Sequence, residues 1–106
     1  MTTTISVCTI NAVKVEYDPA KDASNRVKHG VSLTEAQRLD WDAALTVPDT
    51  RRPYGEERYV ATAPLEGRLH VAAFTMRANK IRVISLRKAN RREITRYETQ
   101  IRKSQN

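Results

Sequence analysis

The sequence contains very little cysteine and histidine and has no long apolar run. Cys8 is the only cysteine, which excludes an intrachain disulfide. The only histidines are His29 and His70, and their spacing offers no recognisable zinc site, so we expect no metal or other cofactor. No segment approaches the roughly 20 apolar residues of a membrane span, and no basic-then-apolar leader opens the chain. The protein is therefore expected in the cytoplasm.

Positive charge is concentrated at the C-terminal end. The formal net charge is +7, yet residues 1–76 contain nine Lys/Arg and ten Asp/Glu. Residues 77–106 contain ten Lys/Arg and two Asp/Glu, which gives this segment a net charge of +8. Such a local excess attracts polyanions, so nucleic acid or an acidic protein is the expected partner. The alternative is a solvated helix whose charges only keep the protein soluble.

The chain is long enough for one folded domain, and 40% of its residues are hydrophobic. We expect a single domain over residues 13–106. Residues 1–12 show no clear period and form an N-terminal extension, which is either flexible or an additional edge strand.

A strand is predicted over residues 13–17, because apolar and polar residues alternate there. A helix over residues 19–29 follows, since Asp18 is a favourable N-cap and Pro19 a favourable first helical residue. Gly30 can adopt the left-handed conformation that ends a helix. The expected buried face of this helix consists of Ala20, Ala23 and Val27.

A second short helix is predicted over residues 33–39, because Ser32 and Glu35 form a capping-box pattern. The chain is then loop-like as far as Glu57, and residues 43–47 could form a short edge strand within this segment.

Period-two alternation predicts three further strands and turns short enough for antiparallel hairpins. A final helix is expected from Asn90, with basic residues around an apolar stripe of Ile94, Tyr97 and Ile101. These elements predict an α+β fold in which two N-terminal helices and a basic C-terminal helix pack on an antiparallel sheet. The sheet is a three-strand meander plus one or two further strands, and the meander strands cover residues 58–63, 69–76 and 81–87.

From Val15 to about Tyr97 the chain resembles the BrnT toxins of the RelE-like ribonuclease group. The blocks that carry the resemblance are Glu16–Lys21 with Asn25, Lys28–Ser32, Gly55–Tyr59, and Ile81–Ala89 with Arg91–Glu93 and Tyr97. Two features depart from the family pattern. Residues 1–12 extend beyond the usual start, and Ala63-Pro64 stands where the first hairpin commonly turns through Ile-Gly.

The resemblance implies a RelE-like fold and a metal-independent endoribonuclease toxin of a type II toxin–antitoxin system. Such a toxin cleaves RNA and thereby inhibits translation and growth. The implied partners are the RNA substrate and a cognate antitoxin, a BrnA-like ribbon-helix-helix protein that also binds operator DNA.

Metal-free RNA cleavage uses the neighbouring 2′-OH as nucleophile, so the protein must move two protons and stabilise negative charge on phosphorus. Lys28 is the first catalytic candidate, although a cation at a helix C-terminus also has a structural role. Arg87, at the end of a strand, can donate two hydrogen bonds to a phosphate. Arg58 is the third candidate, and the expected RNA-binding residues are His29, Arg77, Arg82, Lys88, Arg91 and Arg92.

Strand alternation puts Arg82 and Arg87 on opposite faces of their strand. The two can share a cleft only if the strand twists or bulges between them. The aromatic residues that could stack on a base, or equally lie in the core, are Tyr17, Trp41 and Tyr59.

Two other functions are compatible with the sequence. The two helices joined through Gly30 resemble a helix-turn-helix DNA-binding module, although Arg38 is the only cation on the second helix. The second alternative is a non-catalytic module whose basic C-terminal helix binds a nucleic acid or an acidic protein.

Overall fold

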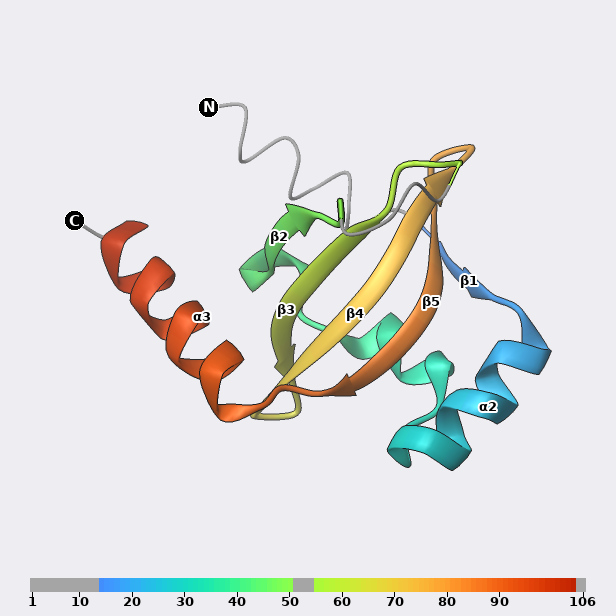
Figure 1. Ribbon diagram of the computed structural model, residues 1–106, viewed down its shortest axis with the longest axis horizontal. Coiled ribbons are helices and arrows are strands. Elements are labelled where there is room, and N and C mark those ends of the chain that lie inside the picture. The colour runs from blue at the N-terminus through green and yellow to red at the C-terminus, as the bar shows by residue number, and fades with distance from the viewer. Residues whose placement is uncertain (1–13, 51–54, 105–106) are drawn as a thin grey trace.

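A five-stranded sheet forms the centre of the fold (Figure 1). The computed structural model describes residues 14–50 and 55–104, so the N-terminal extension predicted over residues 1–12 lies outside the described residues. The strands lie in the order β1-β5-β4-β3-β2. Their bounds are β1 (Val15–Tyr17), β2 (Leu45–Pro48), β3 (Tyr59–Leu65), β4 (Arg68–Arg77) and β5 (Lys80–Lys88).

The sheet is mixed, which corrects the prediction of an antiparallel sheet. Strands β2 to β5 form an antiparallel meander, and β2 overlaps the edge strand that the sequence allowed over residues 43–47. Strand β1, however, pairs in parallel with β5, with Val15 beside Ile81. Hairpin turns specify antiparallel neighbours, whereas a parallel pair joins strands that are distant in the chain. The sequence pattern therefore held no local signal for this pairing.

The hairpins that join β3 to β4 and β4 to β5 each turn on two residues with positive φ. These pairs are Glu66-Gly67, with φ of 51° and 80°, and Ala78-Asn79, with φ of 49° and 67°. Positive φ at both central positions is typical of type I′ turns, whose twist matches that of the flanking strands. Strand β3 consequently extends two residues beyond its predicted end at residue 63.

The core lies on one face of the sheet, which we call the core face. Two 3-10 helices, η1 (Leu33–Arg38) and η2 (Trp41–Ala43), cover it. The Trp41 ring packs edge-on against Phe74, with 5.3 Å between ring centroids, and its indole N–H donates to the Ala36 carbonyl at 3.0 Å. Trp41 is therefore a core residue and unavailable for base stacking.

The predicted second helix is the 3-10 helix η1, as hydrogen bonds to the third preceding residue show, for example from Leu39 to Ala36. Leu33 and Ala36 are fully buried. Arg38 forms ion pairs with Glu35 and Glu66. A segment held in the core in this way does not present a recognition helix, which argues against the helix-turn-helix alternative.

Helix α2 (Pro19–His29) has the predicted bounds. The Asp18 carboxylate accepts from the Ala20 N–H at 2.9 Å, and Gly30 ends the helix with φ of 72°. The predicted apolar face is wrong, because Val27 is 87% exposed and both alanines of that face are exposed. The helix packs instead through the polar residues Asp22 and Asn25.

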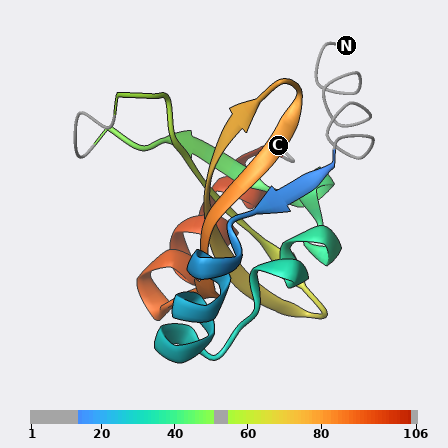
Figure 2. The same ribbon diagram turned by 90° about the vertical axis from the view of Figure 1, so that its right-hand side faces the viewer.

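Helix α3 (Arg91–Ser104) lies on the other side of the sheet, which we call the open face. Figure 2 shows α3 and η1 on opposite sides of the sheet. Asn90 and Glu93 cap the helix reciprocally, with side chain to backbone distances of 2.8 and 2.9 Å. The stripe of Ile94, Tyr97 and Ile101 is half-buried, so α3 is only loosely packed on the sheet.

No helix in the described part of the chain is long and apolar enough to cross a membrane.

Candidate functional site

A bulge in β5 changes the direction of its side chains. Phe74 of β4 pairs with Val83, while the preceding residue, Ala73, pairs with Ser85. Ile84 is thus the additional residue of β5, and the alternation of faces shifts by one position there.

The bulge places two predicted site residues on the same face. Val83 and Leu86 are both buried in the core, although they are three positions apart along the strand. Arg82 and Arg87, their neighbours, therefore both lie on the open face. A bulge between them is one of the two conditions under which the two arginines were expected to be able to share a cleft.

Hydrogen bonds connect helix α2 to β5 just beyond Val83, where the pairing of β5 with β1 ends. The Asn25 amide donates to the Leu86 carbonyl at 2.7 Å and accepts from the Leu86 N–H at 3.1 Å. It also donates to the Val31 carbonyl at 2.8 Å, and the side chain is 4% exposed. The Asn25 side chain thus binds the backbone groups of Leu86 that a neighbouring strand would otherwise bind. It also sets the position of Lys28 and His29 in the following helical turn.

An open cavity of about 230 Å³ lies between α2 and the bulge of β5. Lys28 and His29 line it together with Lys21, Ser24, Asn25, Ile84 and Ser85. None of the described residues that line this cavity carries a carboxylate. Two ammonium groups, an imidazole and two hydroxyls can all donate hydrogen bonds to an oxyanion, so the lining suits a phosphate group.

Arg87 pairs with the carboxylate of Glu93, which was not among the predicted site residues. Its guanidinium donates two hydrogen bonds to Glu93, at 2.8 and 2.7 Å. The hydrogen bonds from Arg87 are the main cause that holds the pKa of Glu93 below its usual value of 4.5. In the sequence Glu93 was named only within the block Arg91–Glu93, because its pairing with Arg87 depends on the turn between β5 and α3.

Arg58 and Arg77 lie at the other end of the open face and share the carboxylate of Glu56. The distances are 3.3 Å from Arg58 and 3.1 Å from Arg77. Hydrogen bonds from Arg77 and then from Arg58 lower the pKa of Glu56. The backbone of the same segment is tied to the sheet by Thr75, whose hydroxyl donates to the Glu57 carbonyl at 2.7 Å.

Arg58 is not brought together with Arg87. Arg58 precedes the residue of β3 that pairs with Phe74, and Arg87 pairs with Val71 of β4. About four residues along β4 separate the two levels, which corresponds to about 13 Å at ~3.3 Å per residue. Arg82 is at the level of Arg58 and pairs with Glu16 of β1 at 3.3 Å. The described residues thus divide the predicted site into two groups.

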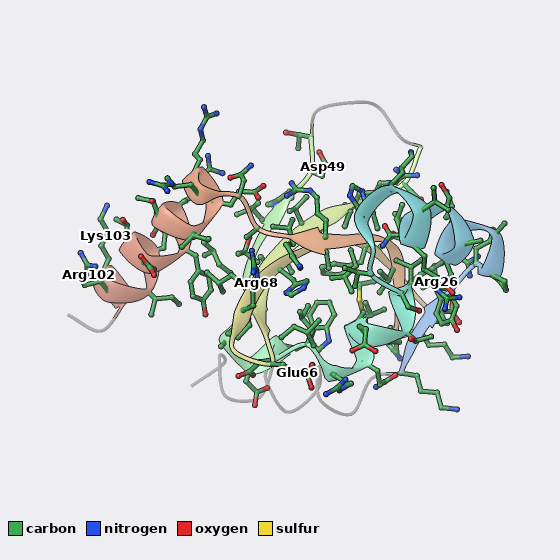
Figure 3. The ribbon with its side chains drawn as sticks, turned by 90° about the horizontal axis from the view of Figure 1, so that it is seen from below. Arg26, Asp49, Glu66, Arg68, Arg102 and Lys103 are labelled. Atoms are coloured by element: carbon green, nitrogen blue, oxygen red, sulfur yellow. The ribbon has the colours of Figure 1, made fainter. Side chains whose placement is uncertain are left out.

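The remaining predicted RNA-binding residues lie next to Arg87. Lys88 ends β5, and Arg91 and Arg92 are exposed in the first turn of α3. Figure 3 shows that the basic surface continues to Arg102 and Lys103 at the far end of α3, while Arg26 of α2 lies at the opposite end of the molecule.

Comparisons with known proteins identify the class to which this chain belongs. The family model for the ribonuclease toxin BrnT of type II toxin–antitoxin systems matches residues 17–93. The fold is similar to the crystal structure of the Brucella abortus ribonuclease toxin BrnT, with a TM-score of 0.61 at 22% identity. That similarity covers 74% of this chain and 99% of the Brucella chain. No match was found among curated proteins.

The protein is therefore a type II toxin of the ribonuclease class. Because the family model covers most of the chain, it belongs to the BrnT family.

The pairing of Glu93 with Arg87 makes stability depend on pH. The pKa of Glu93 is lower in the folded state than its ordinary value of 4.5. The ionised carboxylate therefore stabilises the fold above pH 4.5, and this contribution is lost as the pH falls below 4.5 through the folded-state pKa. We expect Glu93→Gln to lower the free energy of unfolding at pH 7, and the difference from wild type to shrink at pH 3.

Urea unfolding followed by circular dichroism at both pH values measures this difference. Glu98→Gln is the control, because Glu98 is exposed on the same helix and forms no ion pair within residues 14–50 and 55–104. An equal loss of stability for Glu93→Gln at pH 7 and pH 3 would contradict the prediction.

Proposed function

We propose that this protein is a metal-independent endoribonuclease toxin that cleaves RNA in the cytoplasm and so inhibits translation. The observation that supports this best is the position of Ser85. Ser85 lines the same cavity as Lys28 and His29, and it precedes Arg87 by two residues on the open face of β5. An RNA phosphate above Ser85 is thereby within reach of the cations on α2 and of the guanidinium on β5.

In the proposed reaction the 2′-oxygen attacks phosphorus and the bond from phosphorus to the 5′-oxygen breaks. His29 accepts the proton of the 2′-OH, and Lys28 donates a proton to the leaving 5′-oxygen. Arg87 donates two hydrogen bonds to the phosphate oxygens, whose negative charge increases in the transition state. The products are a 2′,3′-cyclic phosphate and a 5′-hydroxyl, and no metal ion takes part.

The other predicted residues are assigned to binding of the RNA backbone. Lys88, Arg91 and Arg92 extend the positive surface from Arg87 onto α3, so we assign them to the phosphates on that side. Arg58, Arg77 and Arg82 lie at the distal end of the open face, where carboxylates partly neutralise them. We therefore give Arg58 a binding role in place of the catalytic role expected from the sequence.

We further propose that the antitoxin is a BrnA-like ribbon-helix-helix protein and that operator DNA is contacted only through it. The toxin's own positive surface then serves RNA and the antitoxin.

The purified full chain is expected to cleave single-stranded RNA in the presence of EDTA and to leave 2′,3′-cyclic phosphate ends. Lys28→Ala is expected to lower the cleavage rate about 100-fold or more, which is typical of the loss of a group that transfers a proton. Gel electrophoresis of labelled RNA measures the rate, and mass spectrometry identifies the product ends.

Lys80→Ala is the matched control, because it removes an exposed lysine at the first residue of β5 that does not line the cavity. Intact RNA after incubation with folded wild-type protein would refute the enzyme proposal. Equal rates for Lys28→Ala and wild type would refute the role of Lys28.

A further inference from the structure

We propose that the groove between α3 and the edge strand β2 binds an acidic peptide segment of the antitoxin. In this arrangement one aliphatic side chain of the segment enters the groove, and neighbouring carboxylates pair with the arginines of α3. The proposal rests on the assignment of this protein as a toxin with an antitoxin partner, but not on its catalytic residues.

The groove is lined by three aliphatic residues, one threonine and two charged residues. Its volume is about 70 Å³, enough for a small aliphatic side chain. The walls come from β2 and β3, and the rim comes from Glu93 and Arg96 of α3. Val47, which lies in the wall on the edge strand, is 48% exposed. The wall residues are Leu45, Val47, Val60 and Thr62.

Helix α3 leaves apolar surface uncovered beside this groove. None of its described side chains is buried, and its stripe of Ile94, Tyr97 and Ile101 is only half-buried. The Tyr97 hydroxyl donates a hydrogen bond to the carbonyl of Ala43, the last residue of η2, at 2.7 Å. A segment lying along the groove would cover the remaining apolar surface of both elements, which favours association.

The charge of α3 indicates the chemistry of the partner. The helix contains five Lys/Arg and two Asp/Glu, and one of the two acids, Glu93, is already paired with Arg87. Carboxylates placed beside the groove would meet an excess of positive charge, which speeds association and selects acidic partners. The exposed cations are Arg91, Arg92, Arg96, Arg102 and Lys103.

The groove suits a peptide better than RNA. Single-stranded RNA is held by aromatic rings on which bases stack, in addition to positive charge. Among the described residues, those that line this groove are Leu45, Val47, Val60, Thr62, Glu93 and Arg96, and none of them is aromatic. The cavity at Lys28 is lined by hydroxyl groups and cations, so it offers RNA more hydrogen-bond donors than the groove does. The two surfaces therefore differ in chemistry.

The test selects binders to the full-length protein from a random peptide library displayed on phage. We expect the enriched peptides to contain Asp or Glu on either side of an aliphatic residue. Synthetic copies are expected to bind Val47→Asp and Arg96→Glu at least about tenfold more weakly than wild type, as measured by fluorescence anisotropy. The matched controls are Val27→Asp and Arg26→Glu, which change the same residue types on exposed α2, and they are expected to bind as wild type.

The outcomes separate this proposal from the ribonuclease proposal. Acidic peptides that bind through Val47 and Arg96 support the docking site even if the protein cleaves no RNA. The docking site is refuted if no peptide is enriched, or if enriched peptides bind the groove variants and the α2 variants equally. It is also refuted if Val47→Asp weakens binding of oligouridine and leaves peptide binding unchanged, because the groove would then belong to RNA.

Discussion

Arg87→Ala is expected to lower the rate constant of RNA cleavage about 10²- to 10³-fold, the usual effect of removing a donor that stabilises transition-state charge. Arg87 lies on the open face because of the bulge at Ile84, and its guanidinium already has a planar, two-bonded arrangement with Glu93. A phosphate oxyanion can take the place of that carboxylate, since both accept paired hydrogen bonds from arginine. Single-turnover kinetics with a labelled RNA measure the effect on kcat separately from KM.

Arg87→Lys tests whether geometry or charge is needed. Lysine keeps the positive charge but cannot donate in the same paired geometry, so this variant is expected to recover only part of the activity. Arg26→Ala is the matched control, because it removes an exposed arginine of α2 that does not line the cavity. A similar loss of activity in Arg26→Ala would show that the effect comes from the change in net charge alone. Full activity in Arg87→Ala would show that Arg87 has no part in the mechanism.

Loss of the Arg87 side chain also leaves Glu93 without its main partner, which affects stability. The double variant Arg87→Ala with Glu93→Gln removes this unpaired carboxylate. We expect the double variant to recover stability relative to Arg87→Ala and to stay inactive, because the phosphate-binding group is still absent. Recovered activity in the double variant would show that Arg87 acts only by neutralising Glu93.

Asn25→Leu is expected to lower the free energy of unfolding by about 3 kcal/mol or more. Asn25 makes three buried or partly buried hydrogen bonds, two to the backbone of Leu86 and one to Val31. The substitution leaves these backbone groups without partners, and each such buried group costs about 1–3 kcal/mol. Urea unfolding followed by circular dichroism measures the loss.

Ser24→Ala provides the control on the same helix, since Ser24 is exposed and its replacement is expected to change stability by less than about 0.5 kcal/mol. A loss below about 1 kcal/mol for Asn25→Leu would show that α2 is held mainly by other contacts. Asn25→Leu is also expected to reduce RNA cleavage at temperatures where the protein is still folded. The reason is that the helix turn with Lys28 and His29 loses its attachment to β5.

Several parts of the fold were predictable because they depend on residues close together in the chain. Asp18, Pro19 and Gly30 specify helix α2 through capping and turn conformation, and Asn90 with Glu93 starts helix α3. The hairpins were predictable from the alternation of apolar and polar residues and from the short turns between the strands. The assignment to the BrnT family also came from short blocks of sequence, and the family model confirms it over residues 17–93.

Other features could not be predicted, because they depend on neighbours that are distant in the sequence. Val27 lies in an apolar pattern, yet it is exposed because the side chain of Asn25 attaches the helix to the sheet. The pairing of Glu93 with Arg87 depends on the turn between β5 and α3, and the separation of Arg58 from Arg87 depends on strand register.

By itself the sequence determined the local elements, the family and the concentration of positive charge in the last 30 residues, because these follow from composition and from neighbours within one or two turns. The tertiary structure alone decided the parallel position of β1, the bulge at Ile84 and the cavity that joins Lys28 to Ser85. Each of these requires segments that are far apart in the chain to lie in one register. That register is set by packing of the whole sheet against η1 and η2, and no short segment of sequence contains it.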